Sequence, residues 1–371
     1  MNADRLRAQW PEGMSAFVTA DPAAVRWLTG LAGEGHVLYG NTPLWAVVGP
    51  EGPAVAVVPA SELAWIDDLD AVRPYGRFVY SGDLSALADA PPLETVIRST
   101  LDELGAGEGV GVDDGLSYPH GLRLAEALAP RRLVACPDVP VRARRRKDAH
   151  ELEALRRVNR IAEEAVLAAI ATFRAGVTER ELLAHVRAEM VARGARPMLG
   201  SVGIGERGAL VDTTPSDRAL RPGEPVRFDV GCERDGYHSD ISRTAVLGAP
   251  PAWVEDAYGA LLAGERAAIA AARPGAVPAD LYEIAVDAVR AAGLGDFDRT
   301  HCGHGIGLRI YEPPLVAPGH TDPLETGMTL CLETPLYMTG VAGLQVEDAI
   351  VITDDGCERL GVAPQDLVVV A

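Results

Sequence analysis

Four acidic residues and one histidine lie in segments that otherwise have the pattern of buried strands, and this combination constrains the fold more than any other feature of the chain. Asp229 and Asp240 flank a turn within VRFDVGCERDGYHSDISRT. The other three lie downstream in GHGIGL, MTLCLET and LQVEDAIVIT, and they are His304, Glu333 and Glu347. We expect these five side chains to share one pocket.

Such a pocket requires cations. Burying several ionised carboxylates is prohibitive unless positive charge neutralises them. One divalent ion would leave surplus negative charge, so the sequence predicts two divalent metal ions. Carboxylate oxygens combined with one imidazole suit Mn, Co, Fe or Zn, whereas Ca would not usually recruit the histidine.

Strand periodicity supports the shared pocket. Successive side chains of a strand alternate between faces, so Asp229 faces opposite to Phe228 and Val230. Across a hairpin, Asp240 can point to the same side as Asp229. A single aspartate in a strand usually marks an edge or a turn. Two that flank one hairpin, together with Glu347 inside another apolar strand, favour a metal site.

Glycines distinguish His304 from the other histidines. Gly303, Gly305 and Gly307 surround it. Glycine allows unusual backbone angles and lets a metal or a substrate approach the chain closely. The remaining histidines are interpreted as ordinary core or surface residues, and His301 is kept as a candidate for lining the site because it lies close to His304 in the sequence.

The chain is long enough for two domains. Its 371 residues can bury a large core. The segment Pro137 to Pro140 is a natural break, so we predict a smaller α/β domain over residues 1–140 and an α+β domain over residues 141–371. In the larger domain, two helices followed by strands occur twice in succession. This order suggests a pseudo-duplicated α+β core.

Local patterns predict elements in the first domain. Residues 22–28 follow Asp21 and open like a helix, and residues 92–104 form an amphipathic helical pattern. The apolar runs 44–48 and 54–58 are joined by the turn sequence PEGP, which predicts a hairpin. No segment of this domain contains a cluster of His, Cys, Asp and Glu that would suggest a metal or catalytic site.

Two further signals mark the start of the second domain. The basic run from Arg142 to Lys147 leads directly into an acidic helical segment, so we interpret it as a solvated linker and helix start rather than as a patch for polyanions. Thr178 and Glu181 form a capping box, in which each side chain satisfies a free backbone donor of the next helix.

Charge and composition exclude several partners. The formal net charge of −19 argues against nucleic acid or an anionic membrane, since both repel an acidic surface. No window approaches the ~18 continuous apolar residues that a membrane helix needs. The N-terminal segment shows no secretory signal, and the five cysteines contain no CxxC pair. We therefore expect a cytosolic protein with reduced thiols.

The sequence contains no complete motif of several other enzyme classes. The segment from Gly203 to Gly208 matches GxGxxG, but the following ALVDTTPSD does not open a helix as a dinucleotide site requires. An HExxH pattern that begins at His150 ends on Ala154 instead of histidine. Neither GxSxG nor a P-loop is present, which removes the commonest serine hydrolase and nucleotide hydrolase interpretations.

The five residues resemble the pita-bread metallopeptidases, which include aminopeptidase P, prolidase, methionine aminopeptidase and creatinase. The family pattern is an aspartate, a second aspartate eleven residues later, GHGIGL, a glutamate and a further glutamate, and all five positions match. DGYHSDISRT and VEDAIVITDDGCERL are also similar to the family. The resemblance extends over residues 142–369 and is weaker before them. It implies a pita-bread catalytic domain preceded by a smaller creatinase-like α/β domain.

The resemblance also implies a role for each ligand. Asp229 would bind one metal, His304 and Glu333 would bind the other, and Asp240 and Glu347 would bridge both. A hydroxide held between the ions would attack a carbonyl or amidine carbon. Glu333 would take the proton of the attacking water and pass it to the leaving nitrogen.

Three positions near the site differ from the proline-specific peptidases. Tyr311 stands where the family usually has a histidine seven residues after His304, and Asp212 replaces a histidine seventeen residues before Asp229. Gln345 replaces a common arginine two residues before the last glutamate. These positions normally orient the substrate or the oxyanion, so Asp212 and Tyr311 are candidate catalytic residues, and Gln345 and His301 are candidate substrate-binding residues.

These observations lead to one prediction and two alternatives. We predict a dinuclear-metal hydrolase, comparable in reaction to an Xaa-Pro dipeptidase or aminopeptidase, that cleaves a C–N bond in a dipeptide or small amide. The first alternative is a pathway-specific amidohydrolase whose substrate carries a positive charge suited to Asp212. The second is a non-catalytic pseudopeptidase, against which the five intact ligands argue. The resemblance further implies a homodimer.

Overall fold

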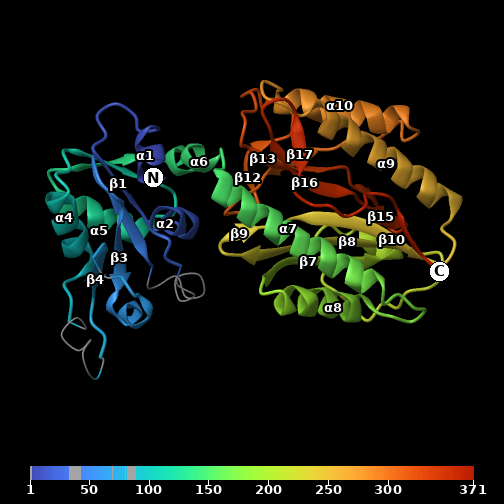
Figure 1. Ribbon diagram of the computed structural model, residues 1–371, viewed down its shortest axis with the longest axis horizontal. Helices are drawn as coiled ribbons and strands as arrows, with labels where there is room; N and C mark the ends of the chain where they lie inside the picture. The colour runs from blue at the N-terminus through green and yellow to red at the C-terminus, as the bar shows by residue number, and fades with distance from the viewer. Residues whose placement is uncertain (1, 33–42, 69, 80, 82–88) are drawn as a thin grey trace. The chain divides into compact units, whose positions relative to one another are not determined.

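The computed structural model describes residues 2–32, 43–68, 70–79, 81 and 89–371. Contacts divide the chain into two compact units, Met1–Arg144 and Arg145–Ala371 (Figure 1). The break expected at residues 137–140 falls at the start of α6 (Asp138–Arg144), the last helix of the first unit. Pro140 lies in the first turn of this helix, where a proline costs no intrahelical hydrogen bond.

The described residues of the first unit form a mixed six-stranded sheet in the order β4-β3-β2-β1-β5-β6, with helices beside it. Its strands are β1 (Ala16–Thr19), β2 (Trp45–Val48), β3 (Val55–Pro59), β4 (Val72–Tyr75), β5 (Gly109–Val112) and β6 (Arg132–Ala135). Its other helical elements are α1 (Asn2–Arg7), α2 (Pro22–Thr29), the short η1 (Ala60–Trp65), α4 (Leu93–Glu103) and α5 (Tyr118–Leu128). Strand alternation gives the sheet a core on each face: Trp45 and Val47 pack in one, and Ala46 packs in the other.

The elements expected in this unit are confirmed. The Asp21 carboxylate accepts a hydrogen bond from the Ala24 amide at 2.8 Å and so caps α2. Strands β2 and β3 pair in antiparallel register as the expected hairpin. Helix α4 occupies the predicted amphipathic segment, and its apolar side chains pack on the sheet.

The second unit contains four long helices and one short one. They are α7 (Ala149–Ile170), α8 (Glu179–Ala192), η3 (Gly205–Ala209), α9 (Ala252–Ala271) and α10 (Pro278–Ala291). The predicted capping box of Thr178 and Glu181 begins α8, and a second box formed by Asp148 and Glu151 begins α7. Within the described residues, no helix is both long enough and apolar enough to cross a membrane.

A ten-stranded sheet forms the centre of the second unit. Its main path runs in the order β12-β11-β13-β16-β10-β8-β7, with β9, β17 and β18 attached beside it, and β14 and β15 form a separate pair. The strands are β7 (Arg196–Ile204), β8 (Pro225–Arg234), β9 (Tyr237–His238), β10 (Ile241–Leu247), β11 (Gly303–Gly305), β12 (Glu312–Leu315), β13 (Thr329–Glu333), β14 (Leu336–Met338), β15 (Ala342–Leu344), β16 (Glu347–Ile352), β17 (Cys357–Arg359) and β18 (Val368–Val370).

Helices α9 and α10 cover one face of β13 and β16. Leu330 and Leu332 of β13 and Ile350 and Ile352 of β16 are buried in one cluster with the apolar side chains of both helices. Because side chains alternate along a strand, residues 333 and 347 face away from this cluster. The order of two helices followed by strands, repeated once, agrees with the expected α+β core.

The interpretation of the basic run as a solvated linker is wrong for Lys147. Its ammonium group lies 3.2 Å from the Glu312 carboxylate, and both side chains are at most 3% exposed. Arg145 also pairs with Glu325. These contacts join the start of the second unit to β12 and to the segment before β13. Sequence adjacency to an acidic helix did not reveal them because the acidic partners lie more than 160 residues away.

The packing of α9 on α10 gives a prediction about two glycines in one helix. A Cβ atom at Gly264 would overlap a Val289 methyl group and lie 2.8 Å from the Ala285 carbonyl oxygen, whereas a Cβ atom at the exposed Gly259 would meet nothing within 4 Å. Gly259→Ala should therefore raise the free energy of unfolding by about 0.5–1 kcal/mol through helix propensity. Gly264→Ala should lower it by about 1–3 kcal/mol through overpacking. Urea unfolding of both variants checks this, and equal effects would contradict the packing.

Candidate metal centre

Five neighbouring strands supply the five predicted ligands. His304 lies in β11, Glu333 ends β13, Glu347 begins β16, Asp240 immediately precedes β10, and Asp229 lies in β8. These strands are consecutive in the sheet. The ligands are therefore brought together by strand pairing although they span more than a hundred positions of the sequence.

The strand register places three of the carboxylates in one row. Asp229 pairs with Ser242, Ser242 pairs with Glu347, and Glu347 pairs with Glu333. Directly paired residues project from the same face of a sheet. The small side chain of Ser242 leaves space between Asp229 and Glu347, and Asp240 lies two residues before Ser242. The row thus forms the floor of an acidic pocket.

The ligand atoms lie within reach of a common ion. Carboxylate oxygens of Asp229, Asp240 and Glu347 lie within 4.8 Å of one another. His304 Nε2 lies 3.8 Å from Asp240 Oδ2 and 3.8 Å from Glu347 Oε1. Atoms at these separations are too far apart for direct hydrogen bonds and are spaced as ligands around a cation would be.

Burial makes it energetically unfavourable for the acidic side chains of this cluster to be ionised together. Asp240, Glu333, Glu347 and His304 are each at most 6% exposed. Burial, reinforced by the charge of Asp229, raises the pKa of Glu333 to about 7, and it raises the pKa of Asp240 and of Glu347 well above the ordinary range. Burial lowers the pKa of His304 to about 4, so its imidazole is neutral at pH 7 and can act as a metal ligand.

The protein's own groups do not satisfy the pocket. Asp240 Oδ1 is buried and has no hydrogen-bond partner among the described residues. A buried carboxylate oxygen normally has such a partner, so this atom fits the position of a metal ligand. Cys331 Sγ also lies within 4.8 Å of ligand atoms of His304 and Glu347. Burial and the charge of Glu347 raise the pKa of Cys331 well above its ordinary value, so it remains a thiol and not a thiolate ligand.

The four predicted residues outside the ligand set line the same cavity, whose volume is about 500 Å³. They are Asp212, His301, Tyr311 and Gln345. The Tyr311 ring stacks on the His304 ring with 3.6 Å between centroids, and His301 Nδ1 lies 3.2 Å from Glu333 Oε1 outside hydrogen-bonding geometry. The Gln345 amide donates to Glu333 Oε2 at 3.2 Å and to Glu347 Oε2 at 3.3 Å.

Sequence reasoning missed Arg227, which is completely buried below this cavity. Its guanidinium donates to Asp229 Oδ2 at 2.9 Å and to Gln345 Oε1 at 2.8 Å. It also donates to Ser201 Oγ and to the carbonyl oxygens of Gly208, Leu210 and Val211, at 2.7–3.1 Å. Arg227 therefore holds a ligand, the Gln345 amide and the loop that leads to Asp212.

A signal for Arg227 was present in the sequence. It is a charged residue within an apolar strand, two positions before Asp229 and therefore on the same face. Two further residues that line the cavity, Arg299 and Tyr337, have no such signal. Arg299 lies in the loop after α10 and Tyr337 in β14, and only the fold brings them to the ligands.

Comparison with known proteins identifies the family. The model of Metallopeptidase family M24 matches residues 153–354, which is more than half of the chain. The chain is a metallopeptidase of family M24. It is 33% identical over 347 residues to a probable dipeptidase, PepE, of Mycobacterium tuberculosis, covering 88% of this chain and 86% of that protein. It is 32% identical over 262 residues to the Xaa-Pro dipeptidase of Pyrococcus furiosus, covering 70% and 75% of the two chains.

A solved structure shows the fold. The dipeptidase PepE of Mycobacterium ulcerans is 29% identical and superposes with a TM-score of 0.82 over 100% of this chain and 96% of that one. The predicted pita-bread fold, metallo-hydrolase class and requirement for divalent metal are confirmed for this M24 metallopeptidase. The ligand assignment and the roles of the surrounding residues stay predictions.

The contacts of Arg227 predict a large stability effect in the M24 metallopeptidase. Arg227→Met should lower the free energy of unfolding of the metal-free protein by about 3–5 kcal/mol, because Asp229 would keep a buried charge without its partner. Arg227→Lys should recover only part of this loss, since one ammonium cannot reproduce a fork of hydrogen bonds. Urea unfolding measures both. The matched control is Arg157→Gln, which removes an exposed arginine of α7 and should be neutral.

The raised carboxyl pKa values predict the pH dependence of stability. Glu333 has an ordinary pKa of 4.5 and a folded-state pKa of about 7 in the metal-free protein. Its contribution to stability is fully present below about pH 4.5 and is lost as pH rises through about 7, because the unfolded state then releases a proton that the folded state keeps. Asp240 and Glu347 act in the same direction.

The measurement compares chemical unfolding between about pH 5.5 and 8 with a chelator and with added Mn²⁺. Metal requires ionised ligands, so its stabilising effect should grow over the interval in which the metal-free protein weakens. Glu333→Gln should flatten the slope of the metal-free protein. A metal-free stability that rises steadily across this interval would contradict the electrostatic argument.

Proposed function

We propose that this M24 metallopeptidase is a dipeptidase that uses two divalent ions and accepts Xaa-Pro dipeptides. The observation that carries the proposal is the row of buried carboxylates on adjacent strands, with His304 beside it and one oxygen of Asp240 unpartnered. Four carboxylates exceed the charge of one divalent ion, which supports two. The relatives named Xaa-Pro dipeptidase and dipeptidase support the substrate class.

The positions of the ligands suggest how they divide between the ions. Asp229 lies at one end of the row, and Glu333 and His304 lie toward the other end. Asp240 and Glu347 lie between them, each within 3.8 Å of His304 Nε2 and grouped with Asp229. Asp240 and Glu347 are therefore the bridging ligands in this proposal, and the buried cluster becomes nearly neutral when both sites are filled.

Two bound divalent ions would supply a water of lowered pKa and positive charge for the developing oxyanion. The chain's own residues supply the proton transfers. Glu333 lines the cavity, and its carboxylate can accept a proton from the attacking water and return it to the leaving nitrogen. His301 lies beside its Oε1, and the Gln345 amide holds its Oε2. Glu333 is accordingly the general base and acid.

In this proposal Tyr311 donates a hydrogen bond to the substrate. It is 56% exposed, lines the cavity and lies flat against His304. Burial of part of its ring and the four neighbouring carboxylates raise its pKa, so the phenol keeps its proton and can act as a donor. In this proposal it stabilises the oxyanion, in place of the histidine that the family usually has.

The alternative of an amidohydrolase for a cationic substrate depends on Asp212 and Gln345. Asp212 is exposed and lines the cavity, as that alternative requires. The cavity is nevertheless lined by Arg299 and Arg309 as well, and Arg227 donates to Gln345 from below. These arginines favour a substrate with an anionic group, as a dipeptide has. The homodimer and the cytoplasmic location complete the proposal and are not needed for the reaction.

A substrate and metal screen tests the function. The protein purified with Mn²⁺ should contain about two equivalents of metal and should hydrolyse Xaa-Pro dipeptides, and a chelator should abolish the activity. Glu333→Gln should lower kcat by about 100-fold or more, because the general base is lost. The matched control is Glu255→Gln, which changes an exposed glutamate of α9 and should leave kcat unchanged.

The same screen separates the alternative. Cationic small amides are assayed beside the dipeptides, and Asp212→His with Tyr311→His is assayed beside the wild type. Efficient cleavage of cationic amides alone, together with a gain of peptidase activity in the double variant, would replace the dipeptidase with the amidohydrolase. Stoichiometric metal without cleavage of any amide would contradict both.

A further inference from the structure

Arg299 has a guanidinium group that the protein leaves available inside the cavity of the metal ligands. The residue lines this cavity together with Glu333 and Gln345. Its backbone amide donates to Asp298 Oδ1 and its carbonyl accepts from the Tyr282 hydroxyl, but its side chain makes no hydrogen bond or ion pair with the described residues. Its Nε is buried and has no partner within the part of the chain that the structure describes. A buried guanidinium donor without an acceptor in the protein is available to a water molecule or to an anion from outside the chain.

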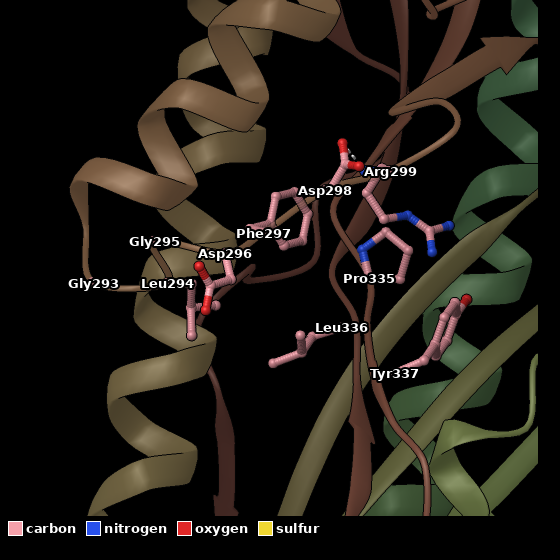
Figure 2. A pocket seen from close by; sticks show the side chains of 10 residues that line it. All are labelled: Gly293, Leu294, Gly295, Asp296, Phe297, Asp298, Arg299, Pro335, Leu336 and Tyr337. Atoms are coloured by element: carbon pink, nitrogen blue, oxygen red, sulfur yellow. Dashed lines mark hydrogen bonds between the residues drawn. The ribbon is translucent and has the colours of Figure 1, made fainter.

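The side chain is held in place by an aromatic ring. The Arg299 guanidinium carbon lies 5.0 Å from the centroid of the Tyr337 ring, a cation–π contact. Figure 2 shows the side chain leaving the loop after Phe297, passing Pro335 and extending toward Tyr337, whereas the Asp298 carboxylate points away from the guanidinium. This contact with the ring uses none of the guanidinium hydrogen-bond donors.

The Tyr337 ring is itself fixed from the metal side. The Arg227 guanidinium carbon lies 5.2 Å from its centroid, and the Tyr337 hydroxyl lies 3.4 Å from Gln345 Oε1. The donors of Arg227 are engaged by protein acceptors, as described above. Of these two arginines, Arg299 is therefore the one that can bind a ligand, and Arg227 supports it through Tyr337 and Gln345.

Resting on the proposed dipeptidase function, we propose that Arg299, stacked on Tyr337, binds the free C-terminal carboxylate of the substrate. That carboxylate lies one residue beyond the scissile bond, roughly 3.5 Å along an extended chain, so its anchor must line the same cavity as the metal ligands. A guanidinium matches a carboxylate with two parallel hydrogen bonds. The anchor would make the enzyme select dipeptides over dipeptide amides.

A second role for the same arginine is to offset the charge of the carboxylate cluster. Its charge lowers the pKa of Glu333 against the larger effect of burial. The two roles differ in what they predict. A charge-balancing arginine affects every substrate and the metal affinity equally, whereas a carboxylate anchor affects only ligands that carry the carboxylate.

The test compares alanyl-proline with alanyl-prolinamide, which differ only in that group. Arg299→Gln should raise KM for alanyl-proline about 10- to 100-fold with kcat within about threefold, since a charge-assisted hydrogen bond is lost from ground and transition states alike. The kinetic constants for alanyl-prolinamide should not change. Arg299→Lys should restore part of the KM, because it keeps the charge but not the fork.

One control variant, one comparison variant and one binding measurement complete the design. Arg157→Gln removes an exposed positive charge on α7, and Arg309→Gln removes the other arginine that lines the cavity. Calorimetry with free proline reports carboxylate binding without turnover, and Arg299→Gln should weaken it by a similar factor. Thermal unfolding shows whether each variant is folded, and the folded Arg299→Lys protein is compared if Arg299→Gln is not.

Equal changes for alanyl-proline and alanyl-prolinamide in Arg299→Gln would overturn the proposal, as would a carboxylate-specific loss found in Arg309→Gln alone. Failure of the wild type to cleave any dipeptide would contradict the proposed function and not this inference. In that case the calorimetry with free proline tests the inference. A loss of proline affinity confined to Arg299→Gln supports the carboxylate anchor, and an unchanged proline affinity in this variant overturns it.

Discussion

Mutual repulsion among buried carboxylates is the constraint on which this structure depends. Asp229, Glu347 and Glu333 lie in one row across adjacent strands, and like charges opposite each other weaken strand pairing. The sheet is stable around them only because protonation or cations reduce the charge. Apolar packing of α9 and α10 on the other face of β13 and β16 supplies the free energy that keeps the row assembled. The site is therefore a strained arrangement that metal binding relieves.

The protein provides positive charge around this row in two ways. Arg227, below the cavity, has its donors committed to Asp229, Gln345 and backbone carbonyls, so it is a fixed structural cation. Arg299 keeps its side-chain donors available, and within the described residues its guanidinium contacts the Tyr337 ring. Tyr337 contacts both guanidinium groups. It thus connects the arginine that supports the predicted metal ligands with the arginine that we propose as the substrate anchor.

The structure shows what surrounds two of the residues that differ from the proline-specific peptidases, Gln345 and Tyr311. A glutamine at position 345, where the family commonly has an arginine, means one positive charge fewer in the site. In the structure its oxygen accepts from Arg227 and its amide nitrogen donates to Glu333 and Glu347, so it transmits the influence of the buried arginine to two ligands. Tyr311 covers His304 instead of leaving a gap. The cavity is lined by polar and cationic groups, which suit the peptide substrate that we propose.

The sequence by itself determined the identity of the predicted ligands, because several carboxylates and a glycine-flanked histidine in apolar strands are difficult to bury without a metal. Strand alternation gave the faces of Asp229 and Glu347, and local caps and turns gave α2, α8 and the β2–β3 hairpin. The buried pair of Lys147 and Glu312 and the meeting of Arg299 with Tyr337 were decided only by tertiary structure. Such contacts join segments far apart in the chain, and no local periodicity records which distant side chains the strand order will bring face to face.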